Sequence, residues 1–221
     1  MFHWNTTAHY FTSTLFSHPS VDVFFGDRNL TGDANISKID LTQVHGDTIA
    51  YVSSSEKNVE ADGLVTRTRL LTLSVKTADC VPIVFYDLKT NTCAISHQGW
   101  RGLLKELPKK MIGKLAANRS RPEEIIAAIG PSINACCYQV DKKLFSAFSK
   151  SLPKYKEAYV KRENKYYLHL QKLAYDQLLR AGMKATNIDH FPFCTMCDGH
   201  RFYSHRRDGT ARRMISSVTM L

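Results

Sequence analysis

The sequence predicts a mixed α+β fold. Short apolar segments typical of strands gather between residues 59 and 99, and longer amphipathic segments follow them. Strands and helices interleave without the regular period of a doubly wound sheet. With 221 residues the chain can bury a substantial core. We therefore expect residues 1–221 to form one domain.

The expected elements of the first half begin after residue 40, because residues 1–40 carry few sustained patterns apart from turn signals at 24–29 and 30–35. Segments rich in Val, Ile, Leu and aromatic residues predict strands over 62–66, 70–75, 81–86 and 92–96. A helix is expected over 103–118. Pro108 requires that this helix begin near it or kink there.

In the second half, residues 123–133 predict a strand that ends in a Gly-Pro turn, and residues 142–150 predict a short amphipathic helix. Leucines at helical spacing predict a helix over 168–182, with Gly182 at its C-terminal cap. Further strands are expected over 187–193, 201–205 and 214–221. The charged segment 151–166 is expected to be a surface connection.

The charge balance favours anionic partners, because 30 Lys and Arg against 20 Asp and Glu give a net charge of +10. No zinc-finger spacing or ribonucleoprotein aromatic motif accompanies this charge, so we do not expect nucleic-acid binding. The uncharged runs fall short of the roughly 20 apolar residues of a membrane helix, so no membrane association is expected.

Six cysteines suggest disulfides, but we expect no signal peptide, and a chain of this size favours reduced thiols in the cytoplasm. Cys194 and Cys197 have the CxxC spacing that binds zinc or supports redox chemistry. The pair is half a structural zinc site, and the adjacent Cys136 and Cys137 are poorly placed to complete it. Core packing is the expectation for these cysteines.

Three polar positions next to expected strand ends could form a reactive site. His45 precedes a glycine in QVHG, Cys80 lies in TADC, and His97 lies in SHQGWRG. Two histidines and a cysteine suit zinc, with a fourth position open, and zinc lowers the pKa of bound water to give a hydroxide nucleophile. Long gaps between ligands do not define a motif, and a histidine before a glycine is more often a turn residue.

A second arrangement uses the same residues. Cys80 would be a nucleophile, His97 its base and Asp79 an orienting carboxylate, provided that the thiol pKa is lowered. Beside them, Trp100 offers a face for stacking and Arg101 can bind phosphate or carboxylate. An ordinary strand-to-helix turn explains these two residues equally well, so spacing alone leaves both questions open.

Taken together and in order, the motifs QVHG, ADGLVT, TADCVPIVFYD, SHQGWRG, IGPSINACCYQV and FCTMCDGHRFYSHRRDGTARRM resemble the laccase-domain or polyphenol oxidase family. Its members are also described as purine nucleoside phosphorylases and peptidoglycan editing factors. The resemblance spans about residues 41 to 221, so residues 1–40 are a divergent N-terminal part. It implies a layered α/β/β/α sandwich with mixed sheets.

The resemblance also implies a metal-dependent enzyme. The expected reactions are phosphorolysis of adenosine, inosine, guanosine and methylthioadenosine and deamination of adenosine, with phenol oxidation as a further activity. Purine nucleosides and phosphate are then the partners. Zinc, or copper as the alternative, would be held by His45, Cys80 and His97.

Other residues of the matched motifs receive roles from the same resemblance. Asp62 and Asp79 are the candidates for proton transfer, and Gln43, Trp100 and Arg101 are the candidates for substrate binding, with Arg101 and the basic tail as a cradle for phosphate. The family shares its fold with deamidating toxins that use a Cys-His pair, so a hydrolase with Cys80 as nucleophile stays open. A non-catalytic protein that binds an anion or nucleic acid is the third alternative.

The chain departs from the family pattern at three places. Gln98 stands where the family has alanine, and we expect it to narrow the pocket or add a hydrogen bond. Residues 11–20 replace a TRxGGxS segment that helps line the family's pocket. The tail reads TARR in place of TGR, which leaves open whether Arg212 or Arg213 matches the family's arginine.

Overall fold

The computed structural model describes residues 1–30, 39, 41–55 and 58–221. Most of the turn predicted at 30–35 lies outside these residues. The turn predicted at 24–29 is confirmed, because strand β3 ends at Gly26 and the Asp27 carboxylate accepts a hydrogen bond from the Asn29 amide at 2.6 Å. Every helix within the described ranges falls short of the length and apolar character that a membrane span requires.

The strands are short, and most of them lie in the first 130 residues. They are β1 (Phe2–Asn5), β2 (Tyr10–Ser13), β3 (Val21–Gly26), β4 (Leu41–Thr42), β5 (Ile49–Tyr51), β6 (Val59–Glu60), β7 (Gly63–Thr66), β8 (Leu73–Thr77), β9 (Val81–Asp87), β10 (Thr92–Gln98), β11 (Ile126–Ile129), β12 (Gln139–Val140), β13 (Tyr159–Arg162), β14 (Lys165–Leu168), β15 (Ile188–His190) and β16 (Met214–Met220).

Among the described residues, the helices follow β10 in the chain, except for one short 3₁₀ turn. The α-helices are α1 (Trp100–Leu104), α2 (Leu107–Ala117), α3 (Lys142–Ser151), α4 (Leu170–Arg180) and α5 (His205–Asp208). The 3₁₀ helices are η1 (Thr14–Phe16), η2 (Pro122–Glu124), η3 (Pro153–Ala158) and η4 (Ala185–Asn187).

Two sheets form the body of the molecule. The first is antiparallel, with the order β1-β2-β3-β16-β8, and it joins strands from both ends of the chain. The second is mixed, with the order β15-β11-β9-β10-β7-β5. Smaller sheets pair β12, β14 and β13, and β4 with β6. The sharing of one sheet by both chain ends supports the proposal that residues 1–221 form one domain.

Alternation along β9 shows how the layers are built. Val81, Ile83 and Phe85 belong to the core cluster that includes the helices, whereas Val84 and Tyr86 belong to the cluster between the two sheets. Successive side chains of a strand point to opposite faces, so a strand covered on both faces reads as a continuous apolar run. Each large side chain buried in this way contributes roughly 1.5–3 kcal/mol.

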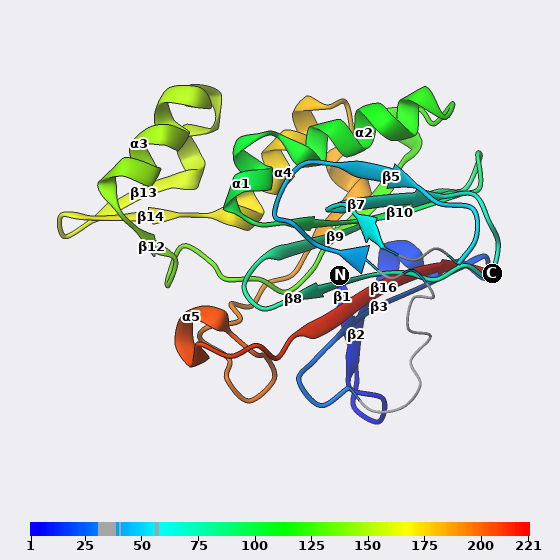
Figure 1. Ribbon diagram of the computed structural model, residues 1–221, viewed down its shortest axis with the longest axis horizontal. Coiled ribbons are helices and arrows are strands. Elements are labelled where there is room, and N and C mark those ends of the chain that lie inside the picture. Colours follow the sequence, from blue (N-terminus) through cyan, green and yellow to red (C-terminus); the bar gives the residue numbers. More distant parts are fainter. Residues whose placement is uncertain (31–38, 40, 56–57) are drawn as a thin grey trace.

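The α+β class is therefore confirmed. Figure 1 shows helices α1, α2 and α4 over one face of the six-stranded sheet, with the five-stranded sheet on its other face. The layers run helix, sheet, sheet. In the described part of the chain, no α-helix lies across the outer face of the five-stranded sheet to form the outer helical layer that the resemblance implies.

Most predicted elements are found, and Pro108 and Gly182 act as expected. Pro108 lies in the first turn of α2, and the predicted helix 103–118 is broken where Glu106 adopts a left-handed φ of 56°. Gly182 follows α4 with a φ of 99°, a conformation that favours glycine.

Two segment predictions are wrong. Residues 201–204 form no strand, because the Ser204 side chain caps the start of α5 and the preceding chain bends back toward Asp198. The segment 151–166 is more than a connection, since it contains η3 and most of the β13–β14 hairpin. Periodicity misses such short elements because local hydrogen bonds, and not a repeating apolar face, stabilise them.

Candidate functional site

The candidate site lies where the strands β8, β9 and β10 end or begin. His97 is the penultimate residue of β10, and Cys80 directly precedes β9. His45 comes from the loop between β4 and β5 with a left-handed φ of 58°. The structure brings these three residues together although 52 residues of chain separate the first from the last.

The three side chains form a compact group of ligand atoms. One atom from each of His45, Cys80 and His97 lies within 4.8 Å of the other two. The two imidazole rings meet edge to face, with centroids 4.7 Å apart and an interplanar angle of 87°. A Cβ atom at Gly99 would lie 3.1 Å from the His45 ring and 3.5 Å from the Cys80 sulfur, so glycine at this position lets the chain pass close to the group.

Asp62 holds two members of this group in place. Its carboxylate is fully buried and accepts hydrogen bonds from His97 Nδ1 at 2.8 Å, from the His45 amide at 3.1 Å and from the Gly46 amide at 2.6 Å. A carboxylate that binds one ring nitrogen of a histidine fixes the ring and leaves the other nitrogen for a metal. Asp62 thus supports the group from behind.

The charges of this group are coupled. Burial opposes ionisation of the Cys80 thiol, but hydrogen bonds from His45 and His97 outweigh it and lower the pKa of Cys80 to about 6. Burial likewise opposes the charged form of His97, and the hydrogen bonds to Asp62 and Cys80 raise the pKa of His97 to about 9. Without a bound cation, the group therefore favours a thiolate beside an imidazolium near neutral pH.

The low thiol pKa predicts the reactivity of Cys80. In the metal-free protein, iodoacetamide should alkylate Cys80 with a pH midpoint near 6, against an ordinary value of 9.0, and reaction should slow as the pH falls through 6. The His97→Gln variant should move the midpoint toward 9.0. Peptide mass spectrometry separates Cys80 from the other thiols. A midpoint near 9.0 in both proteins would exclude the predicted thiolate.

Asp79 precedes Cys80 in the chain, but its carboxylate is directed elsewhere. It accepts hydrogen bonds from the Thr195 hydroxyl at 2.7 Å, the Ser204 hydroxyl at 3.0 Å and the Arg206 amide at 2.7 Å. Its own backbone has a left-handed φ of 85°. Asp62, and not Asp79, is the carboxylate that orients His97.

Two hollows open beside the cysteine and share His45 and Cys80. The larger measures about 530 Å³ and the smaller about 280 Å³. The larger is lined by Leu41, Gln43, His45, Lys76, Ala78, Cys80, His97, His205 and Arg213. The smaller is lined by His45, Ala78, Asp79, Cys80, Gly99, Trp100, Arg101, Ile133, Tyr138, Leu170, His205 and Arg206. Their combined size suits a small organic ligand.

The residues predicted to bind substrate all border these hollows. Trp100 and Arg101 line the smaller one, and the Arg101 guanidinium covers one face of the Trp100 indole at 4.4 Å from the ring centroid. Gln43 lines the larger one, but both ends of its amide bind the backbone of Lys76, at 2.9 and 2.8 Å. These two hydrogen bonds tie the loop that carries His45 to the edge of β8.

The structure adds lining residues that the sequence analysis did not single out. His205 faces both hollows, Lys76 borders the larger and Tyr138 the smaller. His205 lies within the matched SHRRDG motif, which is the signal that could have identified it. Of the two arginines left open in the tail, Arg213 lines the larger hollow.

Gln98 adds hydrogen bonds, as one of the two expectations has it, but it does not narrow the pocket. His97 and Gln98 are consecutive in β10, so their side chains point to opposite faces of the sheet. Gln98 is fully buried, its amide donates to the Val81 carbonyl and accepts from the Ser96 hydroxyl, and it lines neither hollow. Residues 11–20 line neither hollow either, and Leu15 and His18 border a different depression.

Comparisons with known proteins identify relatives of this arrangement. A family model described as "Multi-copper polyphenol oxidoreductase laccase" matches residues 28–221. Over 163 residues the chain is 34% identical to "Purine nucleoside phosphorylase YlmD" of Bacillus subtilis (strain 168), covering 72% of this chain and 58% of that protein. Over 150 residues it is 34% identical to "Adenosine deaminase RL5" of an unknown prokaryotic organism, covering 67% of this chain and 57% of that protein.

The chain thus spans less than two thirds of the length of these two relatives. A solved structure, that of Bacillus licheniformis hypothetical protein YfiH, superposes with a TM-score of 0.88 at 26% sequence identity. The superposition covers 100% of this chain and 99% of that one. The similarity of fold therefore extends along the whole chain.

Proposed function

The chain belongs to the multi-copper polyphenol oxidoreductase laccase family, as its motifs predict, and from this premise we propose that it is a metal-dependent enzyme of purine nucleosides. The proposed reactions are phosphorolysis of adenosine, inosine, guanosine and methylthioadenosine, and deamination of adenosine. The names of the relatives, a purine nucleoside phosphorylase and an adenosine deaminase, support this substrate class.

One observation carries the proposal. Two imidazoles and one thiol from three distant segments converge beside the two hollows, where His45 and Cys80 border both and His97 borders the larger one. A buried carboxylate fixes one of those imidazoles, and such a second layer of hydrogen bonds is typical of histidines that bind metals. Burial of polar groups is costly unless they have partners, and the buried pair of His97 and Asp62 beside the more accessible Cys80 and His45 supports a functional site.

We propose zinc as the metal, held by His45, Cys80 and His97. The donor set fits, since zinc binds imidazole and thiolate and a site with three protein ligands keeps an open position. Copper is the alternative, because thiolate and imidazole suit it as well. When bound, zinc supplies a Lewis acid that lowers the pKa of water and stabilises developing negative charge.

The chain's own residues would bind and orient the substrate. We assign the purine to the smaller hollow, where Trp100 and Tyr138 offer aromatic surface, and the phosphate to the basic residues Lys76 and Arg213 of the larger one. In phosphorolysis, a phosphate oxygen bonds to the ribose C1′ as the C1′–N9 bond breaks and the purine leaves with a proton. In deamination, water adds at C6 and ammonia leaves.

Asp62 and Asp79 differ in what they can contribute. Asp62 holds the proton on His97 Nδ1, which leaves Nε2 to bind the metal, so we assign Asp62 to positioning the ligand. The three hydrogen bonds to the Asp79 carboxylate favour a positioning role for Asp79 as well, in place of the predicted proton transfer. His205, which borders both hollows, is our candidate for moving a proton.

A second candidate function is hydrolysis with Cys80 as nucleophile and His97 as base, and the lowered pKa of Cys80 favours it. Asp62 would be the orienting carboxylate in that case. The two candidates differ in how they respond to thiol reagents. Labelling of Cys80 in the zinc-loaded protein, with loss of activity, would favour the nucleophile, because a coordinated thiolate is protected.

The reaction itself tests the proposal. The zinc-loaded protein, incubated with adenosine, should release adenine and ribose 1-phosphate when phosphate is present and inosine when it is absent, as measured by liquid chromatography. Metal-stripped protein should form neither, because nothing then replaces the Lewis acid. Binding of phosphate by the zinc-loaded protein, without any product from adenosine, would instead support the non-catalytic anion-binding protein.

A further inference from the structure

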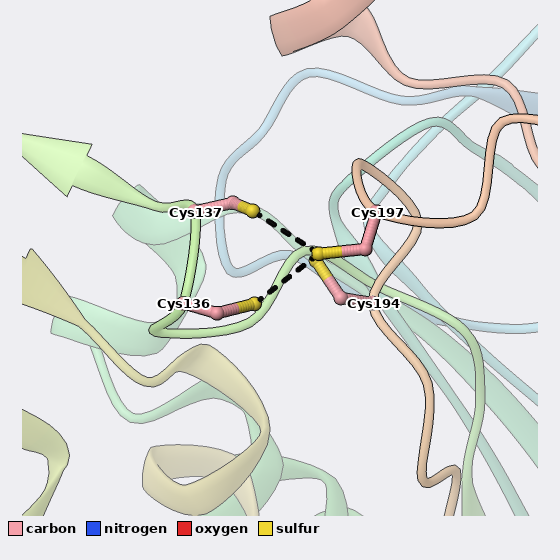
Figure 2. A group of neighbouring side chains, drawn as sticks. All are labelled: Cys136, Cys137, Cys194 and Cys197. Atoms are coloured by element: carbon pink, nitrogen blue, oxygen red, sulfur yellow. Dashed lines mark hydrogen bonds between the residues drawn. The ribbon is translucent and has the colours of Figure 1, made fainter.

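Four cysteines form a second cluster that the proposed function does not use. Cys136 and Cys137 lie in the loop after β11, and Cys194 and Cys197 in the loop after β15. One sulfur from each lies within 4.8 Å of the other three. Figure 2 shows the side chains of each pair pointing toward those of the other.

The prediction that these cysteines pack in the core is confirmed for Cys194, which belongs to the core cluster on the helix side, and is wrong for Cys136 and Cys197. Cys136 and Cys197 are exposed, Cys137 is half-buried, and Cys194 alone among the four is buried. A thiol that serves only as a small apolar group is among the most buried side chains of a protein. Three solvent-accessible thiols gathered around a buried fourth therefore need another explanation.

The backbone of both loops explains how adjacent cysteines can contribute together. Within residues 134–138 the chain turns back, since the Cys137 and Tyr138 amides both donate to the Asn134 carbonyl at 2.9 Å. This turn directs both sulfurs toward Cys197, at 3.6 Å from Cys136 and 3.3 Å from Cys137. In this conformation the adjacent Cys136 and Cys137 are therefore well placed to bind one ion together with Cys197, contrary to the expectation from the sequence.

The two loops are joined to each other by the backbone. The Thr195 amide donates to the Ser132 carbonyl at 3.0 Å, next to an isolated parallel bridge between Ser132 and Cys194. The Asn134 amide donates to the Cys194 sulfur at 3.4 Å, and backbone amides lower the pKa of Cys194 from its ordinary value against the effect of burial. Amide groups directed at a sulfur stabilise its thiolate form, as hydrogen bonds around metal ligands do.

The distances between sulfurs agree with a tetrahedral ion site. Four sulfurs about 2.3 Å from a zinc ion at tetrahedral angles lie about 3.8 Å from one another. The observed sulfur–sulfur distances of 3.3 and 3.6 Å lie slightly below this value, and the upper limit of 4.8 Å for the whole group lies above it. A disulfide would require about 2.05 Å. The spacing is that of ligands around a cation.

We propose that Cys136, Cys137, Cys194 and Cys197 bind one thiophilic divalent cation, zinc in the first place, as a closed structural site. Four protein ligands leave no open position, which is typical of structural zinc and not of catalytic zinc. The Arg162 guanidinium adds positive charge beside the cluster, since it binds the Ala135 carbonyl. Arg207, whose charge is paired with Asp208, holds the carbonyls of Thr195 and Met196 in place.

The position of this site gives it a role for the candidate active site. Tyr138, directly after Cys137, lines the smaller hollow, and Thr195, directly after Cys194, donates to Asp79 beside Cys80. A cation at the four sulfurs would therefore join the loop that lines the smaller hollow to the loop that holds the Asp79 carboxylate. Binding to the folded state alone also stabilises that state.

Zinc titration of the reduced, metal-stripped full-length protein tests the proposal, with metal content measured by native mass spectrometry. Wild type should bind about two zinc ions per chain, and the Cys136→Ser/Cys197→Ser and Cys80→Ala variants about one each. The Cys93→Ala variant, which changes a buried cysteine between the sheets, is the matched control and should keep both. A double variant that keeps the wild-type zinc content would overturn the proposal.

A second measurement needs no substitution and covers the case in which the double variant does not fold. Zinc should protect all four cysteines of wild type from N-ethylmaleimide by at least about tenfold in rate, because coordinated thiolates are poor nucleophiles toward this reagent. Peptide mapping reports each cysteine separately. Equal labelling with and without zinc at these four positions, or a disulfide among them in place of zinc, would also overturn the proposal. The labelling measurement does not depend on activity toward adenosine. The four-cysteine site can therefore be confirmed or excluded independently of the proposed function.

Discussion

The Cys80→Ala variant should lose zinc from the candidate site and turn over adenosine more than about a thousandfold more slowly than wild type. Cys80 is the single anionic ligand of the proposed triad, and its loss leaves two imidazoles to hold the ion. A Lewis acid contributes several kcal/mol to stabilising a transition state, and each 1.36 kcal/mol is tenfold in rate. Initial rates with adenosine and phosphate, together with zinc content, measure both effects.

The control for this variant is Cys93→Ala. Cys93 is fully buried in β10 on the side that faces the five-stranded sheet. The substitution therefore also removes one thiol from the protein, but it changes neither the candidate site nor the group of four cysteines. It should keep activity and zinc near the wild-type values. If Cys80→Ala keeps full turnover and full zinc content, both the metal assignment and the nucleophile alternative are wrong.

The Asp79→Ala variant should be less stable than wild type by on the order of 4 kcal/mol. Its carboxylate accepts three hydrogen bonds in a buried position, and alanine would leave the donors of Thr195, Ser204 and Arg206 without that partner. A hydrogen bond to a charged group contributes about 1.5–3 kcal/mol, and buried unsatisfied donors add to the cost. For a chain of this length we expect a decrease in Tm of about 10 °C, measured by calorimetry.

A surface carboxylate provides the matched control for Asp79. Asp47 bonds to the ammonium groups of Lys105 and Lys110 at the protein surface, and Asp47→Ala should cost no more than about 1 kcal/mol, because solvent screens such pairs. Equal stabilities of Asp79→Ala and Asp47→Ala would show that the carboxylate of Asp79 does not anchor the C-terminal segment.

Local sequence patterns, such as apolar runs and the spacing of leucines, predicted much of this fold. The uninterrupted apolar residues of β9 reflect burial on both faces, and the leucines of α4 with Gly182 behind them mark one helix and its end. The same reasoning failed at residues 201–205, where capping by Ser204 replaces the predicted strand. Periodicity identifies an element when a repeating face is buried, and it is silent where single hydrogen bonds decide the conformation.

The sequence predicted which residues belong to the candidate site, but it did not predict how their side chains are arranged. Motif order identified His45, Cys80 and His97, and the structure brings them together. The division of labour between the two aspartates could not be read from position, because Asp79 is the neighbour of Cys80 in sequence and yet binds residues up to 127 positions away. Asp62 lies 35 residues from His97 and orients it.

The amino-acid sequence by itself determined the class of fold, the family and the identity of the three residues that face one another at the centre. Tertiary structure alone decided that Gln98 turns away, that Arg213 borders the larger hollow, and that four thiols from two loops far apart in the chain lie within 4.8 Å of one another. The physical reason is that successive side chains of a strand point to opposite faces of the sheet, and that the register between paired strands decides which side chains become neighbours. Those relations arise only when strands far apart in the chain are paired and packed.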